Sequence, residues 1–239
     1  MYEERFYRNL CGLDYNFQIC YNESDLFIWS DKPIDKDFAY NILKKYYLQI
    51  EEYIKKKPIF FTSLKPLPYD QYAPDIINDM IKSAQYTNVG PFASVAGAIA
   101  QYVGLELLKY TEQLIIENGG DIFLKINEDK KLGVYLGKHF DITIDTIFLK
   151  IKKRKSPFGI ASSSAFIGHS LNFGKADLVT VIAKDAISAD CLATALSNRI
   201  KKIDDIKKIL DIAKNNHLID AILVAFEKKV YLWGDIEIL

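Results

Sequence analysis

The sequence predicts an α+β protein in which an antiparallel sheet packs against helices grouped in pairs. After about residue 113 the spacing of apolar residues changes from helical to alternating, which is typical of half-buried strands. These strands are short and follow one another closely enough to pair as hairpins, with three helical patterns before them and two more before the last two strands. No repeat and no linker interrupts the chain, so residues 1–239 are predicted to form one domain.

The first half of the chain is predicted to begin with strands and continue with helices. Prolines delimit the helices, because proline is tolerated in a first helical turn and disrupts a helix interior. Pro58 therefore ends a long amphipathic helix, and Pro74 and Pro91 each open another. The predicted elements are two strands within residues 7–21 around Gly12, a strand over 25–29, and helices over 35–57, from Pro74, and from Pro91 to about Leu108.

The second half is predicted to be mainly sheet, with two helices. Asn118-Gly119-Gly120-Asp121 separates two alternating segments and is a strong hairpin signal. The predicted strands are 114–117, 122–126, 132–136, 146–150, 158–161, 178–183, 219–226 and 229–233, and the predicted helices are 188–201 and a second one from Asp204.

Composition excludes several classes of protein. Lys+Arg and Asp+Glu each number 31, so no basic field favours nucleic acid or a membrane surface. The longest apolar runs fall far short of the ~20 residues of a membrane span, and the charged N-terminus does not resemble a signal peptide. Cys11, Cys20 and Cys191 are scattered, which supports neither a zinc site nor a disulfide framework. A cytoplasmic protein is expected, and the richness in Lys, Ile and Tyr is typical of a thermophilic or an AT-rich prokaryote.

Asp190 and Thr194 are the candidate metal ligands. Ser188 is a plausible helix N-cap, which would place Asp190 in the first helical turn with Thr194 four residues later on the same face. A carboxylate and a hydroxyl on one face suit Mg²⁺ or Ca²⁺. The alternative is an acid favoured by the helix dipole and a threonine bonded to its own backbone.

Three further segments, small and polar between apolar runs, are candidate ligand-binding sites. Asn118, Gly119, Gly120 and Asp121 either form only a turn or let a ligand lie against the backbone. Ser162, Ser163 and Ser164 either bind a phosphate or a ring carbonyl, or form a solvated loop. Gly90, at the start of a helix of small residues, suits phosphate binding, with close helix packing as the alternative. His169 beside the serine run is the candidate catalytic histidine.

These segments resemble a known family. Gly-Gly-Asp after a strand, a serine-rich turn, and Ala-Asp-x-x-Ala-Thr opening a helix occur in this order in the ApbE superfamily of FAD:protein FMN transferases. A closer resemblance is to an uncharacterised branch of that superfamily found in archaea and bacteria, through Val89-Gly90-Pro91, Glu117-Asn118-Gly119-Gly120-Asp121-Ile122 and Gly168-His169-Ser170. The resemblance spans residues 7–233.

The resemblance implies a tunnelling-type fold and a flavin site. It implies that Asp190 and Thr194 bind Mg²⁺, and that Asn118, Gly119, Gly120 and Ser162 to Ser164 line the pocket for FAD or FMN. The partners it implies are a flavin nucleotide, or another small phosphorylated ligand, and an acceptor protein that receives FMN.

Two departures from the family pattern leave the reaction open. The segment Val95-Ala96-Gly97-Ala98 lacks the Lys-Gly pair of flavin transferases, and the segment around His169 lacks their His-Ile-x-Asp-Pro stretch. Some members of the branch are linked to sulfur assimilation towards homocysteine, for which Cys11, Cys20 or Cys191 would carry the sulfur. A ligand-binding module without catalysis is the third alternative.

Two expectations concern the whole molecule. The small, polar segments between Gly90 and Thr194 are predicted to converge in one cleft, because such residues cluster only there. A homodimer is also expected, because the aromatic N-terminal strands and the Tyr-rich helix offer more apolar surface than a small sheet covers.

Overall fold

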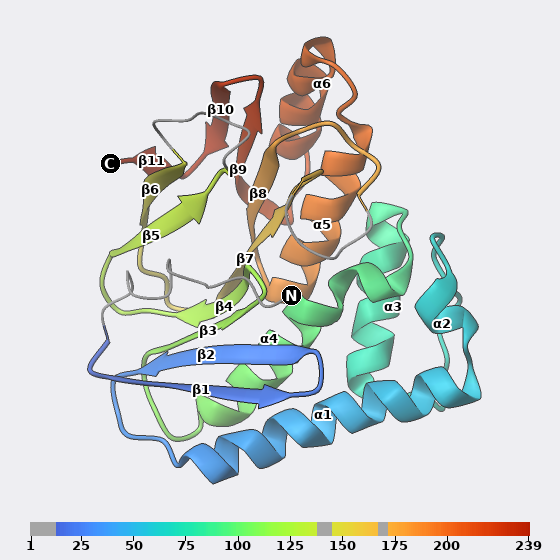
Figure 1. Cartoon of the computed structure of the whole chain (residues 1–239), viewed down its shortest axis with the longest axis vertical. Helices are drawn as coiled ribbons and strands as arrows, with labels where there is room; N and C mark the ends of the chain where they lie inside the picture. Colours follow the sequence, from blue (N-terminus) through green and yellow to red (C-terminus); the bar gives the residue numbers. More distant parts are fainter. Residues whose placement is uncertain (1–12, 138–144, 167–171) are drawn as a thin grey trace.

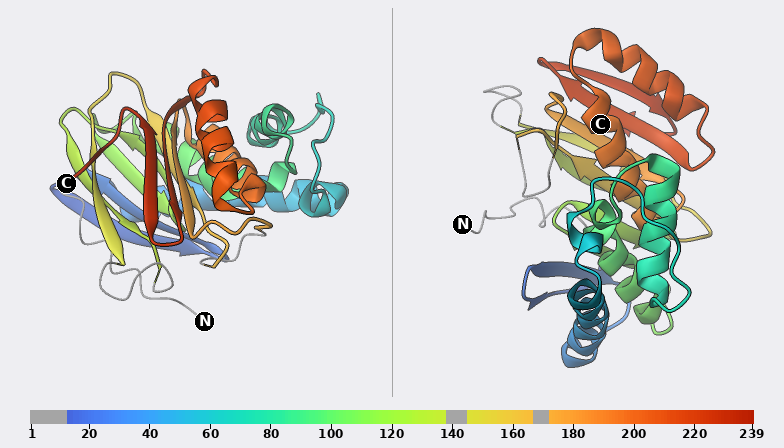
Figure 2. Two further views of the ribbon diagram at one scale, coloured as in Figure 1. Left: turned by 90° about the horizontal axis from the view of Figure 1, so that it is seen from above. Right: turned by 90° about the vertical axis from the view of Figure 1, so that its right-hand side faces the viewer.

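A computed structural model describes residues 13–137, 145–166 and 172–239. They form three layers, with a small sheet on one face of a large sheet and the helices on the other (Figures 1 and 2). The strands are β1 Tyr15–Tyr21, β2 Ser24–Ser30, β3 Leu114–Asn118, β4 Asp121–Lys125, β5 Lys130–Tyr135, β6 Thr146–Ile151, β7 Phe158–Ser163, β8 Leu178–Ala183, β9 Ile219–Phe226, β10 Lys229–Gly234 and β11 Glu237–Ile238. The helices are α1 Lys36–Lys56, α2 Ile59–Thr62, α3 Asp75–Thr87, the 3₁₀ turn η2 Pro91–Ser94, α4 Val95–Leu107, α5 Ala186–Arg199 and α6 Ile203–Lys214.

The large sheet is antiparallel throughout and has the strand order β1-β2-β3-β4-β7-β8-β9-β10. The hairpin β3–β4 and the strand β7 therefore lie side by side at its centre. The small sheet has the order β11-β6-β5. This second sheet, with its short strand β11, was not expected from the sequence pattern.

Successive side chains of a strand alternate between the two faces of the large sheet, and this divides the core into layers. Leu114 and Ile116 of β3 and Phe123 of β4 pack against α1, α3 and α4. The residues between them, Ile115 and Ile122, instead pack with the small sheet. A third cluster joins β7, β8 and β9 to α5 and α6. Because successive side chains of a strand point to opposite faces, neighbouring residues of one strand belong to different layers.

Most predicted elements are confirmed within a few residues, including β9, which spans 219–226 as expected. The segment from Pro91 begins as a 3₁₀ turn and becomes α-helical only at Val95. The helix expected from Ser188 begins at Ala186 instead. The expected strand before Gly12 lies outside the described residues. Within the described ranges, no helix is both long enough and apolar enough to cross a membrane.

Candidate functional site

The tip of the hairpin β3–β4 is a tight turn that requires glycine. Asn118 pairs with Asp121, and Gly119 and Gly120 between them have φ angles of +68° and +103°. A side chain at either glycine would meet no atom within 4 Å, so the backbone conformation and not crowding demands glycine there. The Gly120 N–H donates to Glu117 Oε1 at 2.8 Å, which fixes the turn from one side.

The two acids of the hairpin lie on opposite faces of the large sheet. Glu117 is on the same face as Ile115, towards the small sheet. Asp121 lies two residues before Phe123 on β4, and therefore on the face covered by helices. Asn118 is on that face as well, since its Nδ2 donates to the Ala96 carbonyl of α4 at 3.1 Å.

Asp190 of α5 reaches the same turn of α4. Its Oδ2 accepts a hydrogen bond from the Gly97 N–H at 3.0 Å. A Cβ atom at Gly97 would collide with the carbonyl of Ala186 and lie 3.0 Å from Asp190 Cβ. The small residues of α4 thus allow the two helices to approach until a buried carboxylate can bind the first turn of its neighbour.

The predicted N-cap of α5 was wrong. The cap is Asp185, whose Oδ1 accepts from the Ser188 N–H at 2.8 Å and whose Oδ2 accepts from the Ser188 hydroxyl at 2.7 Å. Asp190 therefore lies in the second turn and not in the first. The carboxylate of Asp190 accepts a hydrogen bond from the first turn of α4. The alternative that Asp190 stabilises the dipole of its own helix, α5, is therefore wrong.

Burial dominates the electrostatics of both acids on the helix-covered face. It raises the pKa of Asp190 to about 7, opposed by the hydrogen bond from Gly97. Burial also raises the pKa of Asp121 well above its usual range, and the charges of Asp190 and Glu117 raise it further, while the Ser162 N–H lowers it. Among the described residues, no Lys or Arg forms an ion pair with Asp121 or Asp190.

This arrangement predicts a pH dependence of stability for the metal-free protein. The pKa of Asp190 is raised in the folded state from 3.8 to about 7, so between these values the folded chain holds a proton that the unfolded chain has lost. The free energy of unfolding should therefore fall as the pH rises from about 4 to about 7. Urea denaturation in EDTA across this range measures the slope, and Asp190→Asn should make it shallower, leaving the part that Asp121 contributes. A variant curve parallel to that of the wild type would contradict the assignment.

Thr194 lies one helical turn after Asp190 and is also buried. The structure shows no hydrogen bond from its hydroxyl to the described residues, so the alternative of a threonine bonded to its own backbone is not supported. No group of three His, Cys, Asp or Glu side chains in the described ranges could hold one ion. Asp121, Asp190 and Thr194 instead offer two carboxylates and a hydroxyl on this face, which suit a hard divalent cation such as Mg²⁺.

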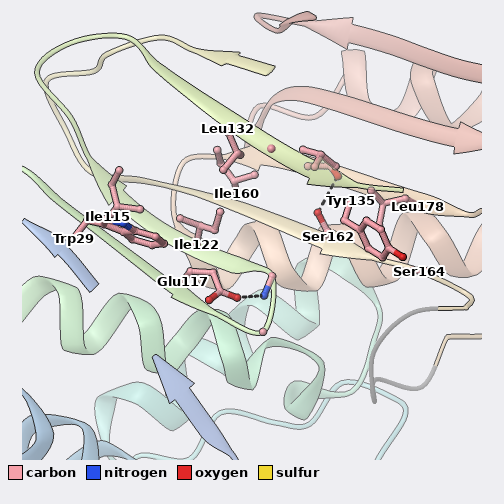
Figure 3. Close-up of a pocket in the computed structure, with 15 residues that line it drawn as sticks. Trp29, Ile115, Glu117, Ile122, Leu132, Tyr135, Ile160, Ser162, Ser164 and Leu178 are labelled. Atoms are coloured by element: carbon pink, nitrogen blue, oxygen red, sulfur yellow. Dashed lines mark hydrogen bonds between the residues drawn. The ribbon is translucent and has the colours of Figure 1, made fainter. Parts of the chain in front are cut away.

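A cavity of about 140 Å³ lies on the other face, between the large sheet and β5 (Figure 3). Apolar side chains form most of its wall. Trp29 lies at one end, and Tyr135, Ser162 and Ser164 lie at the other. Its lining residues are Trp29, Ile115, Glu117, Gly119, Gly120, Ile122, Leu132, Gly133, Val134, Tyr135, Ile160, Ser162, Ser164, Leu178 and Thr180.

The three serines do not act as one group, because they alternate along β7 and beyond it. Ser162 and Ser164 line the cavity, and the Ser162 hydroxyl is bonded to the Thr180 hydroxyl at 2.9 Å. The Ser163 hydroxyl instead accepts from Asn172 Nδ2 at 3.0 Å. The same Asn172 nitrogen donates to Ser197 of α5 at 2.7 Å.

The expectation of one cleft is therefore only partly met. Asn118, Asp121 and Asp190 converge around the first turn of α4, while Gly119, Gly120 and two of the serines line the cavity on the other face. The hairpin tip separates the two groups. Sequence reasoning missed Gly97, Asn172 and Ser197 as positioning residues, together with the cavity residues Trp29 and Tyr135. Only Gly97 carried a signal, as part of a helix of small residues.

The remaining candidates differ in their surroundings. Gly90 is buried, and a Cβ atom there would collide with the carbonyl of Ser63, so the packing alternative describes it better than phosphate binding. Cys191 is buried beside Val89 and Ala195, and burial raises the pKa of its thiol to about 11. Cys20 is exposed, with its Sγ 3.4 Å from Asp25 Oδ1. His169 and Cys11 lie outside the described residues.

The fold is that of the ApbE flavin transferases. The flavinyl transferase ApbE of Pseudomonas stutzeri, solved in its apo form, superposes with a TM-score of 0.60 at 13% identity, covering 97% of this chain and 96% of that one. The flavin transferase ApbE of Vibrio cholerae gives a TM-score of 0.59 at 11% identity, covering 92% and 96%. At such low identity the likeness establishes the fold alone.

Sequence comparison places the chain more narrowly. It belongs to the family whose model is described as "AbpE bacteria", which matches residues 8–220. A UPF0280 protein of Methanocaldococcus jannaschii is 41% identical over 202 residues, covering 83% of this chain and 82% of that protein. A UPF0280 protein of Methanobrevibacter smithii is 42% identical over 169 residues, covering 68% and 70%. The resemblance to a branch of the ApbE superfamily is thus confirmed.

Proposed function

We propose that the chain binds a flavin nucleotide, FAD or FMN, together with Mg²⁺, and acts as a flavin-transferase-like protein towards a protein acceptor. The observation that carries the proposal is the pair of buried carboxylates, Asp121 and Asp190, for which the described residues supply no ion pair. A buried, unpaired carboxylate is unfavourable unless it is protonated or a cation neutralises it. The family and the fold of the ApbE flavin transferases support the same assignment.

Asp190 and Thr194 would hold the cation from one face of α5. Gly97 orients the carboxylate of Asp190 by donating to Oδ2. A divalent cation in this place would neutralise the charge of a pyrophosphate and polarise the bond to be broken. The chain itself fixes the position of the Asp190 carboxylate, because α5 carries this residue and α4 binds it through the Gly97 N–H.

The cavity between the two sheets is proposed to receive the flavin ring. Its walls are mainly apolar, and its polar groups gather at the end where Ser162, Ser164 and Thr180 lie. A planar heteroaromatic ring needs this combination, with apolar surface for its faces and a few hydrogen-bonding groups for its polar edge. Gly119 and Gly120 border the cavity without side chains, so a nucleotide can pass the hairpin tip towards Asp190.

A protein acceptor and a homodimer complete the proposal. The segment equivalent to the Lys-Gly pair of flavin transferases has no lysine, and transfer to an acceptor is proposed from the family. The outer strands β1 and β10 of the large sheet offer edges for the proposed homodimer. Sulfur transfer gains no support from Cys191, which is buried with a raised pKa.

Filling the cavity tests the proposal. Leu132→Trp extends an indole into the cavity and is expected to lower the affinity for FAD at least tenfold, because the ring loses its space. The matched control is Leu232→Trp, on the outer strand β10 and away from the cavity. Calorimetric titration with FAD in excess Mg²⁺ measures the affinity of both variants for FAD. Equal affinity in the two variants would remove the cavity from the site, and no binding of FAD or FMN to the wild type would end the proposal.

A further inference from the structure

Oδ1 of Asp121 is buried and has no hydrogen-bond partner among the described residues. In the described part of the chain, it is the one buried side-chain oxygen or nitrogen atom of which this is true. The residue is only 8% exposed. Leaving a buried carboxylate oxygen without a partner is costly, and native proteins keep such atoms rarely. Asp121 pairs with Asn118, whose side chain is bonded to the turn of α4 that also binds Asp190, so Asp121 lies on the same side of the large sheet as the candidate cation site.

We infer that Asp121 is the second carboxylate of the cation site and binds the ion through Oδ1. The inference rests on the proposed cation role of Asp190. It assigns Asp121 to the metal, whereas the sequence assigned this residue only to the cofactor pocket. Two carboxylates and the Thr194 hydroxyl then supply three oxygen ligands from the hairpin tip and α5.

The backbone fixes Asp121 in the required position. The Asn118 side chain ties the hairpin tip to the Ala96 carbonyl, and Asp190 is tied to the N–H of the next residue, Gly97. Asp121 pairs with Asn118 in the register of the hairpin. Asp121, through Asn118, and Asp190 are therefore both held at the first turn of α4. This places their carboxylates near each other without any direct bond between them.

A structural role does not account for Asp121. The turn is held by the glycines and by Glu117, whose Oε1 accepts the Gly120 N–H. The Ser162 N–H stabilises the charged form of Asp121 but leaves Oδ1 without a partner. An asparagine would satisfy the same backbone without a second buried negative charge beside Asp190. The buried carboxylate therefore destabilises the metal-free fold, and a bound divalent cation would remove this destabilisation.

The test measures binding of Mn²⁺ alone, followed by electron paramagnetic resonance of the free ion, with no flavin present. Asp121→Asn keeps the shape and is expected to weaken Mn²⁺ binding at least tenfold, because losing a charged ligand should cost no less than losing a group that only supports one, which costs about 10- to 100-fold. The matched control is Asp185→Asn, which removes an acid at the N-terminus of α5, where asparagine caps a helix about as well as aspartate. It should bind Mn²⁺ within about twofold of the wild type.

Thermal unfolding gives an independent readout. In EDTA, Asp121→Asn should melt at a higher temperature than the wild type, because a buried like charge is removed. In saturating Mn²⁺ the order should reverse, since only the wild type gains the full stabilisation by the ion. This reversal separates a metal ligand from a merely structural residue, for which both conditions would shift in the same direction.

The outcomes distinguish this inference from the proposed function. Undiminished Mn²⁺ binding by Asp121→Asn, or no binding of Mn²⁺ by the wild type, overturns the role of Asp121, whatever the flavin titration shows. Mn²⁺ binding that depends on Asp121 in a protein that binds neither FAD nor FMN supports the inference and removes the flavin proposal.

Discussion

Asp190→Asn is expected to remove most of the Mg²⁺-dependent affinity for FAD. The substitution keeps the size of the side chain and an oxygen that can accept the Gly97 N–H, so the contact between α4 and α5 survives. It removes one negative charge from a site that has two buried acids and, within the described chain, no basic partner. We expect a loss on the order of 100-fold, equivalent to about 2.7 kcal/mol.

Thr194→Val should cost less than Asp190→Asn, about tenfold, because it removes a neutral oxygen at nearly constant volume. Neither substitution should prevent folding, and Asp190→Asn should stabilise the metal-free protein at neutral pH, because a buried charge disappears.

The matched control for both is Asp185→Asn on the same helix. Asp185 caps α5 through Ser188, and asparagine caps a helix about as well as aspartate. It therefore removes a charge from α5 without touching the site. Titration with FAD in Mg²⁺ and in EDTA compares the variants. Metal-independent binding of equal strength in Asp190→Asn and Asp185→Asn would exclude Asp190 from the site.

Gly97→Ala is the substitution expected to damage both stability and cation binding. A methyl group at this position would collide with the Ala186 carbonyl and lie 3.0 Å from Asp190 Cβ, so α5 must move away. Overpacking of this kind costs about 1–3 kcal/mol, which exceeds the ~1 kcal/mol that alanine gains over glycine as a helix former. The displaced carboxylate of Asp190 should also lose its hydrogen bond to α4.

Gly104→Ala on the same helix is the control, because its methyl group would meet the ring of Phe123 in the core and not Asp190. Both variants should lose stability in urea denaturation, but only Gly97→Ala should lose Mn²⁺ affinity beyond what its unfolded fraction explains. If both variants bind Mn²⁺ equally well, the approach of α4 to α5 does not position Asp190.

The sequence determined the elements of this protein, because their signals are local. Alternating apolar residues around Asn118-Gly119-Gly120-Asp121 specify the hairpin β3–β4, since only such a turn accommodates its two positive φ angles. Prolines delimit α1 and α3 for equally local reasons. The composition and order of the polar segments were likewise enough to indicate the family.

Only the tertiary structure decided which side chains meet. Local sequence favoured Ser188 as the cap of α5, yet Asp185 lies before the helix with its carboxylate on the backbone of Ser188. The serine run looked like one binding loop, but the two-residue period of β7 sends Ser162 to the cavity and Ser163 to Asn172. Strand order and helix packing bring Asp121 and Asp190, 69 residues apart in the chain, to the same turn of α4, about which a local pattern carries no information.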